Sequence, residues 1–373
     1  MNSNNLNLLF VISGMTMGGA ERVMATLANE MVLRGHNVTI LTFHETLPAY
    51  HLRSEVKLIS MESGINTSLK SKNSKFRIMK SAISSMKFYL AQVKREKPDL
   101  ILSFLSKTNL ICILGKKIKY RNIPVIVSER ADPTQRTGLI QKCVERYYKY
   151  SDVVVCQSKK VEMFFKKYNA NTTVIPNPVN EHCINTDLIR KRTNKIIAAG
   201  RLDKQKNYDL LIDSFFEVSK KLSDYTLEIY GKGPEKERLK QKISNLGLDG
   251  KVVLKGTREN LMKNVADAKL YVMSSDFEGF PNALVEAMAS GIPVISTDFP
   301  TGVAKELIKD GENGYVVPVG DKELLTEAII KILSNKDIQD EMSKKNVNLR
   351  EVLNIKCIAN QWEQLFNKVS QTK

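Results

Sequence analysis

The sequence predicts an α/β protein of two domains, each built on a doubly wound parallel sheet. Its 373 residues exceed what one hydrophobic core usually serves. Two series of apolar strands alternate with helical segments, and each series opens with a strand that runs into a glycine-bearing turn. Strands that alternate with helices in this way form parallel sheets covered on both faces.

The first series defines a domain over residues 1–176. Its opening strand is followed by a helix from Glu21 to Leu33, and Gly35 ends that helix. The apolar runs that predict its strands are residues 8–12, 37–43, 100–104, 124–128 and 153–157. The segment VIPNPV at 174–179 holds two prolines that block a continuing helix, so the domain boundary is placed there.

The second series defines a domain over residues 177–355, with a helix near residues 208–222. The runs that predict its strands are residues 195–200, 226–230, 252–254, 270–273 and 293–296. A C-terminal helix over about 356–373 is expected to pack back on the first domain. Ligands of such sheets bind beyond the carboxyl ends of the strands, so two facing domains are expected to share a central cleft.

The charge composition of the sequence restricts the classes of molecule that the protein is expected to bind. The net charge is +17, and residues 1–176 hold 27 Lys and Arg against 12 Asp and Glu, so the first half carries nearly all of the excess. Such asymmetry indicates an anionic partner, either nucleic acid or a membrane surface. No run approaches the roughly 20 apolar residues that span a bilayer, and residues 8–13 are too short for a signal peptide, so a cytoplasmic protein is expected.

No metal site or disulfide framework is predicted. The five cysteines have neither pairing nor metal-binding spacing and are expected to be reduced, and the four histidines share no spacing. The DxD pattern that holds manganese in metal-dependent sugar transferases is absent from the sequence. A mechanism without a metal or other cofactor is therefore the simpler expectation.

The most informative segment is residues 277–297, FEGFPNALVEAMASGIPVIST. It places Glu278 before the start of a predicted helix and Glu286 one turn inside it. The first amides of that helix, near Asn282, lack intrahelical partners and are able to hold an anion. Carboxylates that accept hydrogen bonds from hydroxyls, next to amides that bind phosphate, indicate a site for a nucleotide-sugar.

Three glycine-bearing turns follow predicted strands. Gly18-Gly19 opens the first helix, where glycines allow a backbone to approach phosphate, although a purely structural turn remains an alternative. Gly200 begins the turn GRLDKQKN, in which Arg201 and Lys206 are placed to neutralise a departing diphosphate.

The third turn, YGKGP, has Gly231 and Gly233 positioned to lie under a nucleotide. On its own this turn is a weak signal.

Residues 74–95 form a basic amphipathic helix with two open interpretations. Apolar side chains recur at helical spacing from Met79 to Val93, and lysines occupy the other faces. The helix either lies on an anionic membrane leaflet or packs on its sheet with a basic face exposed. Further basic clusters at 116–121 and 159–167 favour a surface-wide effect.

The motifs together resemble glycosyltransferase family 4, the retaining transferases with the two-domain GT-B fold. They are GGAERV, IPNPV, GRLDKQKN, YGKGP, EGFPNALVEAMASGIPVIST and DGENGYVVP, in the right order over nearly the whole chain. The resemblance implies two Rossmann-like domains facing a central cleft, the first binding an acceptor and the second a UDP-sugar. It also implies transfer with retention and without a metal.

The resemblance assigns roles residue by residue. Arg201, Lys206 and Glu278 are implied to be catalytic, the two cations stabilising the leaving diphosphate. Glu278 is implied to meet sugar hydroxyls, Glu286 to hold the ribose and the amides of 279–282 to hold sugar and phosphate. The implied donor-binding set is Gly200, Arg201, Lys206, Gly231, Gly233, Glu278, Gly279, Phe280, Pro281, Asn282, Ala283, Leu284 and Glu286.

The implied acceptor-binding residues are Gly18, Gly19 and Arg130. Arg130 stands where many relatives place a histidine, in the loop SERADP after a strand of the first domain. A guanidinium does not act as a base near neutral pH, so Arg130 is expected to bind an anionic acceptor or the donor phosphate. The leaving phosphate oxygen is then the candidate acceptor of the proton.

The resulting hypothesis is a cytoplasmic glycosyltransferase, peripheral to the inner face of the cell membrane, that acts in O-antigen or capsule assembly. It moves a hexose or N-acetylhexosamine from a UDP-sugar to a polyprenyl-diphosphate saccharide. One alternative is a GT-B sugar-nucleotide epimerase, which needs an acid/base pair in the first domain. A different class, a basic nucleic-acid-binding protein, would explain the charge, but aromatic residues are not interleaved with the lysines of the first half.

Overall fold

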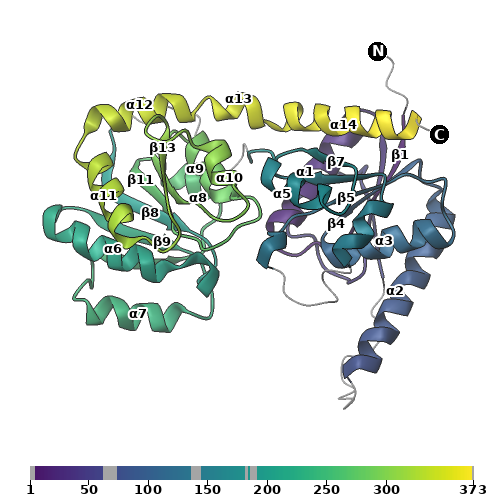
Figure 1. The fold of residues 1–373 in the computed structure, drawn as a ribbon, viewed down its shortest axis with the longest axis horizontal. Helices are drawn as coiled ribbons and strands as arrows, with labels where there is room; N and C mark the ends of the chain where they lie inside the picture. Colours follow the sequence, from purple (N-terminus) through teal and green to yellow (C-terminus); the bar gives the residue numbers. More distant parts are fainter. Residues whose placement is uncertain (1–4, 62–73, 136–143, 181–183, 185–190, 372–373) are drawn as a thin grey trace. The chain divides into compact units, whose positions relative to one another are not determined.

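The chain divides into two compact units, residues 1–177 with 355–373 and residues 178–354. The structure is a computed structural model that describes residues 5–61, 74–135, 144–180, 184 and 191–371 (Figure 1). The sequence places the boundary at 176/177 and assigns a C-terminal helix to the first domain; the first unit contains residues 355–373.

Unit 1 holds a seven-stranded sheet in the order β3-β2-β1-β4-β5-β6-β7, and every pairing in it is parallel. Its strands are β1 (Asn7–Ile12), β2 (Asn37–Thr42), β3 (Lys57–Ser60), β4 (Leu100–Phe104), β5 (Val125–Ser128), β6 (Val153–Cys156) and β7 (Thr172–Val174). Its α-helices are α1 (Gly19–Leu33), α2 (Ser74–Glu96), α3 (Ser106–Ile118), α5 (Lys159–Lys166) and α14 (Ile355–Gln371), with short 3-10 turns η1 (Pro133–Gln135) and η2 (Tyr148–Tyr150).

Both faces of the unit 1 sheet are covered, because neighbouring residues of a strand point to opposite sides. Leu9 and Val11 of β1 belong to a core that includes side chains of α2, α3 and α5. Phe10, between them, contacts Phe366 of α14 with ring centroids 6.2 Å apart. Burial on both faces explains why the inner strands read as continuous apolar runs.

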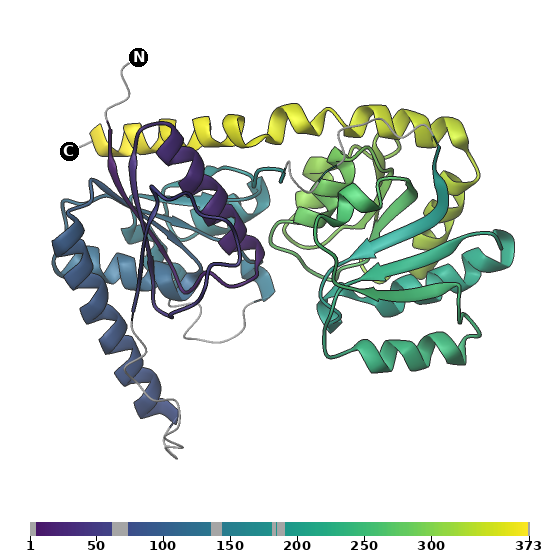
Figure 2. The same ribbon diagram turned by 180° about the vertical axis from the view of Figure 1, so that it is seen from behind.

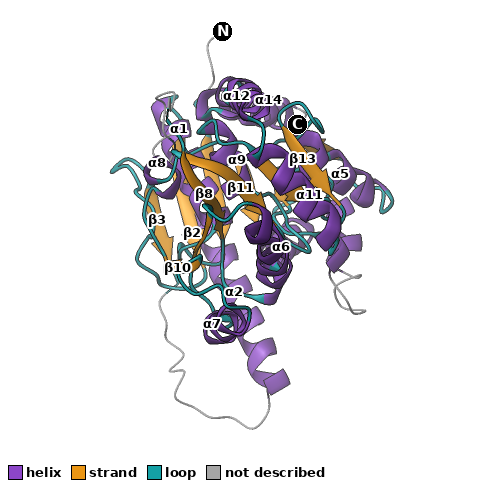
Figure 3. Cartoon of the chain, turned by 90° about the vertical axis from the view of Figure 1, so that its left-hand side faces the viewer, coloured by secondary structure: helices purple, strands orange, loops and turns teal. Residues whose placement is uncertain are grey.

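Unit 2 repeats the architecture with a six-stranded parallel sheet in the order β10-β9-β8-β11-β12-β13 (Figure 3). Its strands are β8 (Thr193–Ala199), β9 (Thr226–Tyr230), β10 (Val252–Gly256), β11 (Ala268–Met273), β12 (Val294–Thr297) and β13 (Gly314–Val317). Its helices are η3 (Lys204–Lys206), α6 (Tyr208–Lys221), α7 (Lys236–Asn245), α8 (Leu261–Asn264), α9 (Asn282–Ala289), α10 (Val303–Leu307), α11 (Lys322–Leu333), α12 (Lys336–Asn346) and α13 (Leu349–Leu353).

Three strands were not predicted from the sequence: β3, β7 and β13. Each lies at an outer edge of its sheet. Edge strands are short and partly exposed, and all three residues of β7 are only half-buried. β3 and β7 therefore lack the apolar run by which the inner strands were recognised, whereas β13 carries a short one, Tyr315 to Val317, that was not recognised.

Helix α2 packs on unit 1 near its C-terminal end and is exposed nearer its start. Toward its C-terminal end Tyr89 and Val93 are buried in the unit 1 core, and the Tyr120 hydroxyl donates to the Leu90 carbonyl at 2.9 Å. Nearer its start Lys80 is exposed and Ile83 is 52% exposed. Both Figure 1 and Figure 2 show this end of α2 projecting from the rest of unit 1.

No α-helix within the described residues has the length and apolarity to cross a bilayer. Cys112, Cys156 and Cys357 are free thiols, and burial raises the pKa of Cys112 to about 12. The remaining two cysteines, Cys143 and Cys183, and the histidine His182 lie outside the described residues.

Candidate active site

The predicted donor residues of unit 2 follow the carboxyl ends of three strands that are neighbours in the sheet, β9, β8 and β11. The turn after β8 carries Arg201 and Lys206, and the loop after β11 carries Glu278 and leads into α9. The topology thus brings together segments that are far apart in the sequence. This edge is where parallel α/β sheets bind ligands.

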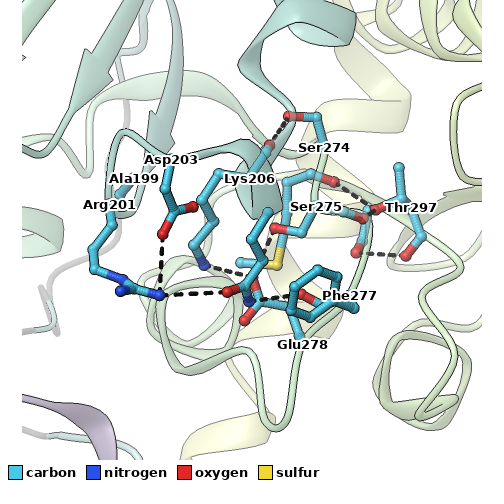
Figure 4. A network of polar contacts seen from close by, with 12 residues as sticks. Ala199, Arg201, Asp203, Lys206, Ser274, Ser275, Phe277, Glu278 and Thr297 are labelled. Carbon is cyan, nitrogen blue, oxygen red and sulfur yellow. Dashed lines mark hydrogen bonds and ion pairs between the residues drawn. The ribbon is translucent and has the colours of Figure 1, made fainter. Parts of the chain in front are cut away.

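Lys206 and Glu278 form an ion pair at the centre of the site (Figure 4), with Nζ 2.5 Å from Oε1. The same carboxylate oxygen accepts the Ser275 hydroxyl at 2.7 Å. The side chains of Lys206 and Glu278 are only 15% and 9% exposed. The pair is therefore largely shielded from water, where charge interactions are stronger.

The lysine is positioned by its own turn. Residues Lys204–Lys206 form a 3-10 turn, and Asn207 follows in the left-handed conformation with φ 44°. The side-chain oxygen of Asn207 caps α6 by accepting a hydrogen bond from the Leu210 amide at 3.2 Å. The Ser274 hydroxyl donates to the Lys206 carbonyl at 2.8 Å, which fixes the turn to the end of β11.

The loop that carries Glu278 is held at both ends. The Thr301 hydroxyl donates to the Glu278 carbonyl at 3.0 Å, and the Gln205 side-chain amide donates to the Phe277 carbonyl at 2.8 Å. The Thr297 hydroxyl donates to the Ser275 carbonyl at 2.6 Å. These hydroxyl and amide partners were not identified from the sequence, because Ser, Thr and Gln at strand ends carry no distinguishing spacing.

Arg201 is placed differently from Lys206, although both are cations of one turn. Its side chain is 75% exposed, and Nη2 lies 3.0 Å from Oδ2 of Asp203. It also donates to the Gln205 side-chain oxygen at 3.4 Å. An exposed pair of this kind is weak and easily exchanged for another anion. Arg201 is thus free to reorient, whereas Lys206 is held in place.

The glycines of the site are required by backbone packing. A Cβ on Gly231, which has φ +152°, would lie 1.8 Å from the Gly200 carbonyl oxygen, and one on Gly233 would lie 2.2 Å from the Leu202 carbonyl oxygen. The Leu202 amide donates to the Lys232 carbonyl at 2.9 Å. The turn after β9 therefore presses directly against the turn after β8, which is a structural reason for glycines predicted from their motif alone.

The first turn of α9 corrects one prediction. The Asn282 amide, expected to be free, donates to the Phe280 carbonyl at 3.0 Å. Pro281, with φ −84° and ψ 70°, makes the tight turn that closes this bond. The amides of Ala283 and Leu284 donate to no atom of the described residues. The free donors of the helix are thus the amides of Ala283 and Leu284, next to Asn282, and both residues belong to the predicted donor-binding set.

Glu286 and Leu284 continue this segment into the interior. Glu286 is 9% exposed and Leu284 is fully buried. Phe280 beside them is 8% exposed. The side of α9 that carries Glu286 is therefore shielded, while Gly279 and Ala283 are half-buried.

A buried tyrosine was missed by sequence reasoning. The Tyr208 hydroxyl at the start of α6 has no hydrogen-bond partner in the described part of the chain. Burial, followed by the nearby charges of Glu278 and Asp203, raises the pKa of Tyr208. Burial also raises the pKa of Tyr271 on β11. Nothing in the sequence separates Tyr208 from an ordinary core aromatic residue.

In unit 1, Gly18 caps α1 in an extended conformation and Gly19 begins the helix. A Cβ on Gly18 would lie 2.3 Å from Oε2 of Glu21, so the helix start faces a carboxylate of its own chain. Burial raises the pKa of Glu21, opposed by a hydrogen bond from its own backbone amide.

Arg130 follows β5, in the loop where it was expected. It is mostly enclosed, and burial lowers its pKa to about 9 against the opposing effect of Glu129. Within the described residues, no group of three or more His, Cys, Asp or Glu side chains is arranged to hold a metal.

Comparison with known proteins places the chain in one family. The family model described as Glycosyltransferase Family 4 matches residues 17–182, and that of Glycosyl transferases group 1 matches residues 183–348.

Two curated relatives extend over the whole chain. A Campylobacter jejuni enzyme, GalNAc-alpha-(1->4)-GalNAc-alpha-(1->3)-diNAcBac-PP-undecaprenol alpha-1,4-N-acetyl-D-galactosaminyltransferase, is 27% identical over 98% of this chain and 99% of its own. The amylovoran biosynthesis glycosyltransferase AmsD of Erwinia amylovora is 24% identical over 96% of this chain and 99% of its own.

Solved structures share the fold. Sucrose-phosphate synthase from Thermosynechococcus elongatus superposes with a TM-score of 0.81 at 18% identity, over 98% of this chain and 99% of that one. Anabaena Alr3699/HepE in complex with UDP gives a TM-score of 0.76 at 18% identity, over 97% and 99%. With two parallel Rossmann-like sheets and consecutive family matches along nearly its whole length, the chain is a glycosyltransferase of family 4 with the GT-B fold.

Proposed function

We propose that this glycosyltransferase moves a hexose or N-acetylhexosamine from a UDP-sugar to a saccharide on polyprenyl diphosphate, in the assembly of a surface polysaccharide. The names of two relatives support the acceptor class: one acts on a diphospho-undecaprenol saccharide and the other in amylovoran biosynthesis. Alr3699/HepE, crystallised with UDP, supports the donor class.

The Lys206–Glu278 ion pair is the observation that best supports a UDP-sugar as the donor. Lys206 neutralises Glu278 at 2.5 Å in the resting site, and a diphosphate that binds nearby gains a share of the same ammonium group. The free amides of Ala283 and Leu284 add donors at the start of α9. Arg201, being exposed, is able to turn from Asp203 toward the incoming phosphates.

Departure of the diphosphate is the step that these groups assist. The bond from the sugar anomeric carbon to the phosphate oxygen breaks, one further negative charge develops on the nucleotide, and fixed cations stabilise it. A new bond forms from the acceptor oxygen to the same face of that carbon. The configuration is retained because the new bond forms on the face from which the phosphate leaves. The acceptor proton passes to the leaving phosphate oxygen, so Arg130 is not required as a base.

We propose that the reaction needs no divalent metal. Two cations and the first amides of a helix provide the positive charge that a metal otherwise supplies. The proposal depends on the placement of Lys206, which is shielded and preorganised, and of Arg201, which is available to a ligand.

We further propose that unit 1 associates with the anionic inner face of the cell membrane, where the lipid-linked acceptor resides. The basic excess of residues 1–176 and the exposed Lys80 and Ile83 of α2 support this. We expect Ile83→Glu to reduce flotation with anionic liposomes. Leu47→Glu, at a 93% exposed position outside α2, is the matched control. Equal flotation of the two variants would argue against docking through α2.

The function is tested by incubating the enzyme with a panel of UDP-sugars and polyprenyl-diphosphate saccharides. We expect one donor to give an extended lipid-linked product whose new linkage is α by NMR when the donor is an α-linked UDP-sugar, with an unchanged rate in EDTA. An inverted linkage would refute the retaining mechanism. Loss of activity in EDTA that added metal restores would refute metal independence. Sugar-nucleotide interconversion without transfer would favour an epimerase.

A further inference from the structure

One edge of the Arg130 guanidinium is held and the other is left without a partner. Its Nη1 donates to the side-chain oxygen of Asn177. Its Nε and Nη2 atoms are buried and bond to no other residue in the described ranges. Nε and Nη2 are the two parallel donors with which arginine grips a phosphate or carboxylate side-on.

Aromatic rings fix the plane of this guanidinium. Its central carbon lies 3.8 Å from the ring centroid of Phe104, at the end of β4, and 5.9 Å from that of Trp362 on α14. The two rings contact each other with centroids 6.3 Å apart. Asn177 is itself fixed, because its side-chain oxygen also accepts the Gln157 amide at 2.5 Å. The direction of the free edge is therefore set in advance.

The neighbouring carboxylate does not occupy the free edge. Oε1 of Glu129 accepts the backbone amides of Arg130 at 3.0 Å and Ala131 at 3.2 Å, and Oε2 accepts the Tyr148 hydroxyl at 2.9 Å. The guanidinium stays charged at neutral pH even though burial lowers its pKa to about 9. Buried charged donors are costly to leave unpaired. The arrangement is thus that of a receptor built for an anion.

We propose that Nε and Nη2 of Arg130 bind a phosphate oxyanion of a substrate side-on, beside the buried rings of Phe104 and Trp362. A phosphate matches the spacing of the two donors and satisfies both at once. The phosphate belongs either to the diphosphate of the lipid carrier or to that of the nucleotide, and this choice of substrates rests on the proposed function. The proposal that Arg130 binds an oxyanion does not depend on that function.

The chain provides a local reporter for this binding. Trp362 is the only tryptophan of the sequence, and its ring lies 5.9 Å from the guanidinium. Its fluorescence therefore reports an anion at Arg130 in the full-length protein without any transfer reaction. Phosphate bound at other basic groups, including Lys206, leaves Trp362 unaffected or shifts it equally in all variants.

The test is a titration with pyrophosphate, followed by Trp362 emission. We expect a saturable change in the wild-type protein that weakens about tenfold in Arg130→Lys, which keeps the charge but loses the two-donor edge, and further in Arg130→Met. Arg95→Met is the matched control, since it removes an equal charge at a 69% exposed side chain. Thermal melting checks that each variant is folded.

Kinetics with the two substrates then identify the source of the phosphate. A rise in KM for the lipid-linked acceptor alone in Arg130→Lys assigns the lipid carrier, and a rise for the UDP-sugar alone assigns the nucleotide; either supports the receptor. Unchanged pyrophosphate affinity in folded Arg130→Met overturns it, even if UDP-sugar transfer proceeds. A weakened Trp362 response in a protein that transfers no UDP-sugar instead refutes only the proposed function.

Discussion

Substitution of Lys206 tests two roles of its ammonium group: stabilising the charge of the leaving diphosphate and stabilising the folded protein. Lys206→Ala deletes the ammonium group 2.5 Å from Glu278 and leaves that carboxylate, only 9% exposed, with a hydrogen bond from the Ser275 hydroxyl. We expect turnover to fall by roughly two or more powers of ten, the scale observed when a preorganised charge-stabilising donor is lost. Stability falls as well, because one partner of a shielded ion pair is missing.

The magnitude of the stability loss follows from burial. Breaking a fully buried pair costs about 3–5 kcal/mol, and the pair here is 15% and 9% exposed. We expect about 3 kcal/mol, which corresponds to a fall in Tm of about 6–12 °C for a unit of this size. Adding Glu278→Gln removes the uncompensated carboxylate and is expected to restore most of the lost stability.

The decisive assay compares Lys206→Ala/Glu278→Gln with Glu278→Gln alone, measuring turnover with saturating donor and Tm by scanning calorimetry. We expect the double variant to have the higher Tm, because Glu278→Gln alone leaves the shielded ammonium group of Lys206 without its carboxylate. We nevertheless expect the double variant to turn over about a hundredfold more slowly, because the cation acts on the leaving group directly. Equal turnover would mean that Lys206 acts only by holding Glu278, and the charge-stabilisation argument would be refuted.

Three further predictions separate activity, packing and charge. Arg201→Ala is expected to lower turnover by roughly two powers of ten with unchanged Tm, because Arg201 is 75% exposed; a large Tm loss would contradict this. Gly231→Ala, whose Cβ would lie 1.8 Å from a carbonyl oxygen, is expected to cost about 3 kcal/mol or more in urea unfolding, against about 1 kcal/mol for Gly247→Ala, which meets no atom within 4 Å. Burial alone would raise the pKa of Glu363, but hydrogen bonds from Arg34 and His36 outweigh it and hold the pKa below 4.5. Stability from this carboxylate is therefore complete above the unfolded pKa and lost as pH falls through the folded pKa. Thermal melts of Glu363→Gln should then approach those of the wild-type protein as pH falls below the folded pKa, and an equal difference at all pH values would refute the linkage.

The apolar runs of the strands and the glycine and proline residues between elements were sufficient to predict the fold class. The inner strands β1 and β4 are buried on both faces, so they appear as apolar runs that local composition reveals. The outer strands β3 and β7 were missed, because each pairs with a single neighbouring strand, remains partly exposed and has no apolar run. Their existence depends on pairing that no local pattern encodes.

The site follows the same division. The sequence alone predicted that GRLDKQKN and FEGFPNALVEAM bind a ligand, and it indicated the family that the comparisons confirm. It gave Arg201 and Lys206 the same standing, whereas the fold leaves the first in solvent and pairs the second with a glutamate. It also gave no indication that Trp362, at the far end of the chain, would support Arg130. Identity and spacing are local properties of a chain, but burial and partnership arise only when distant segments meet at the ends of neighbouring strands, and those decide which charges are held and which are free.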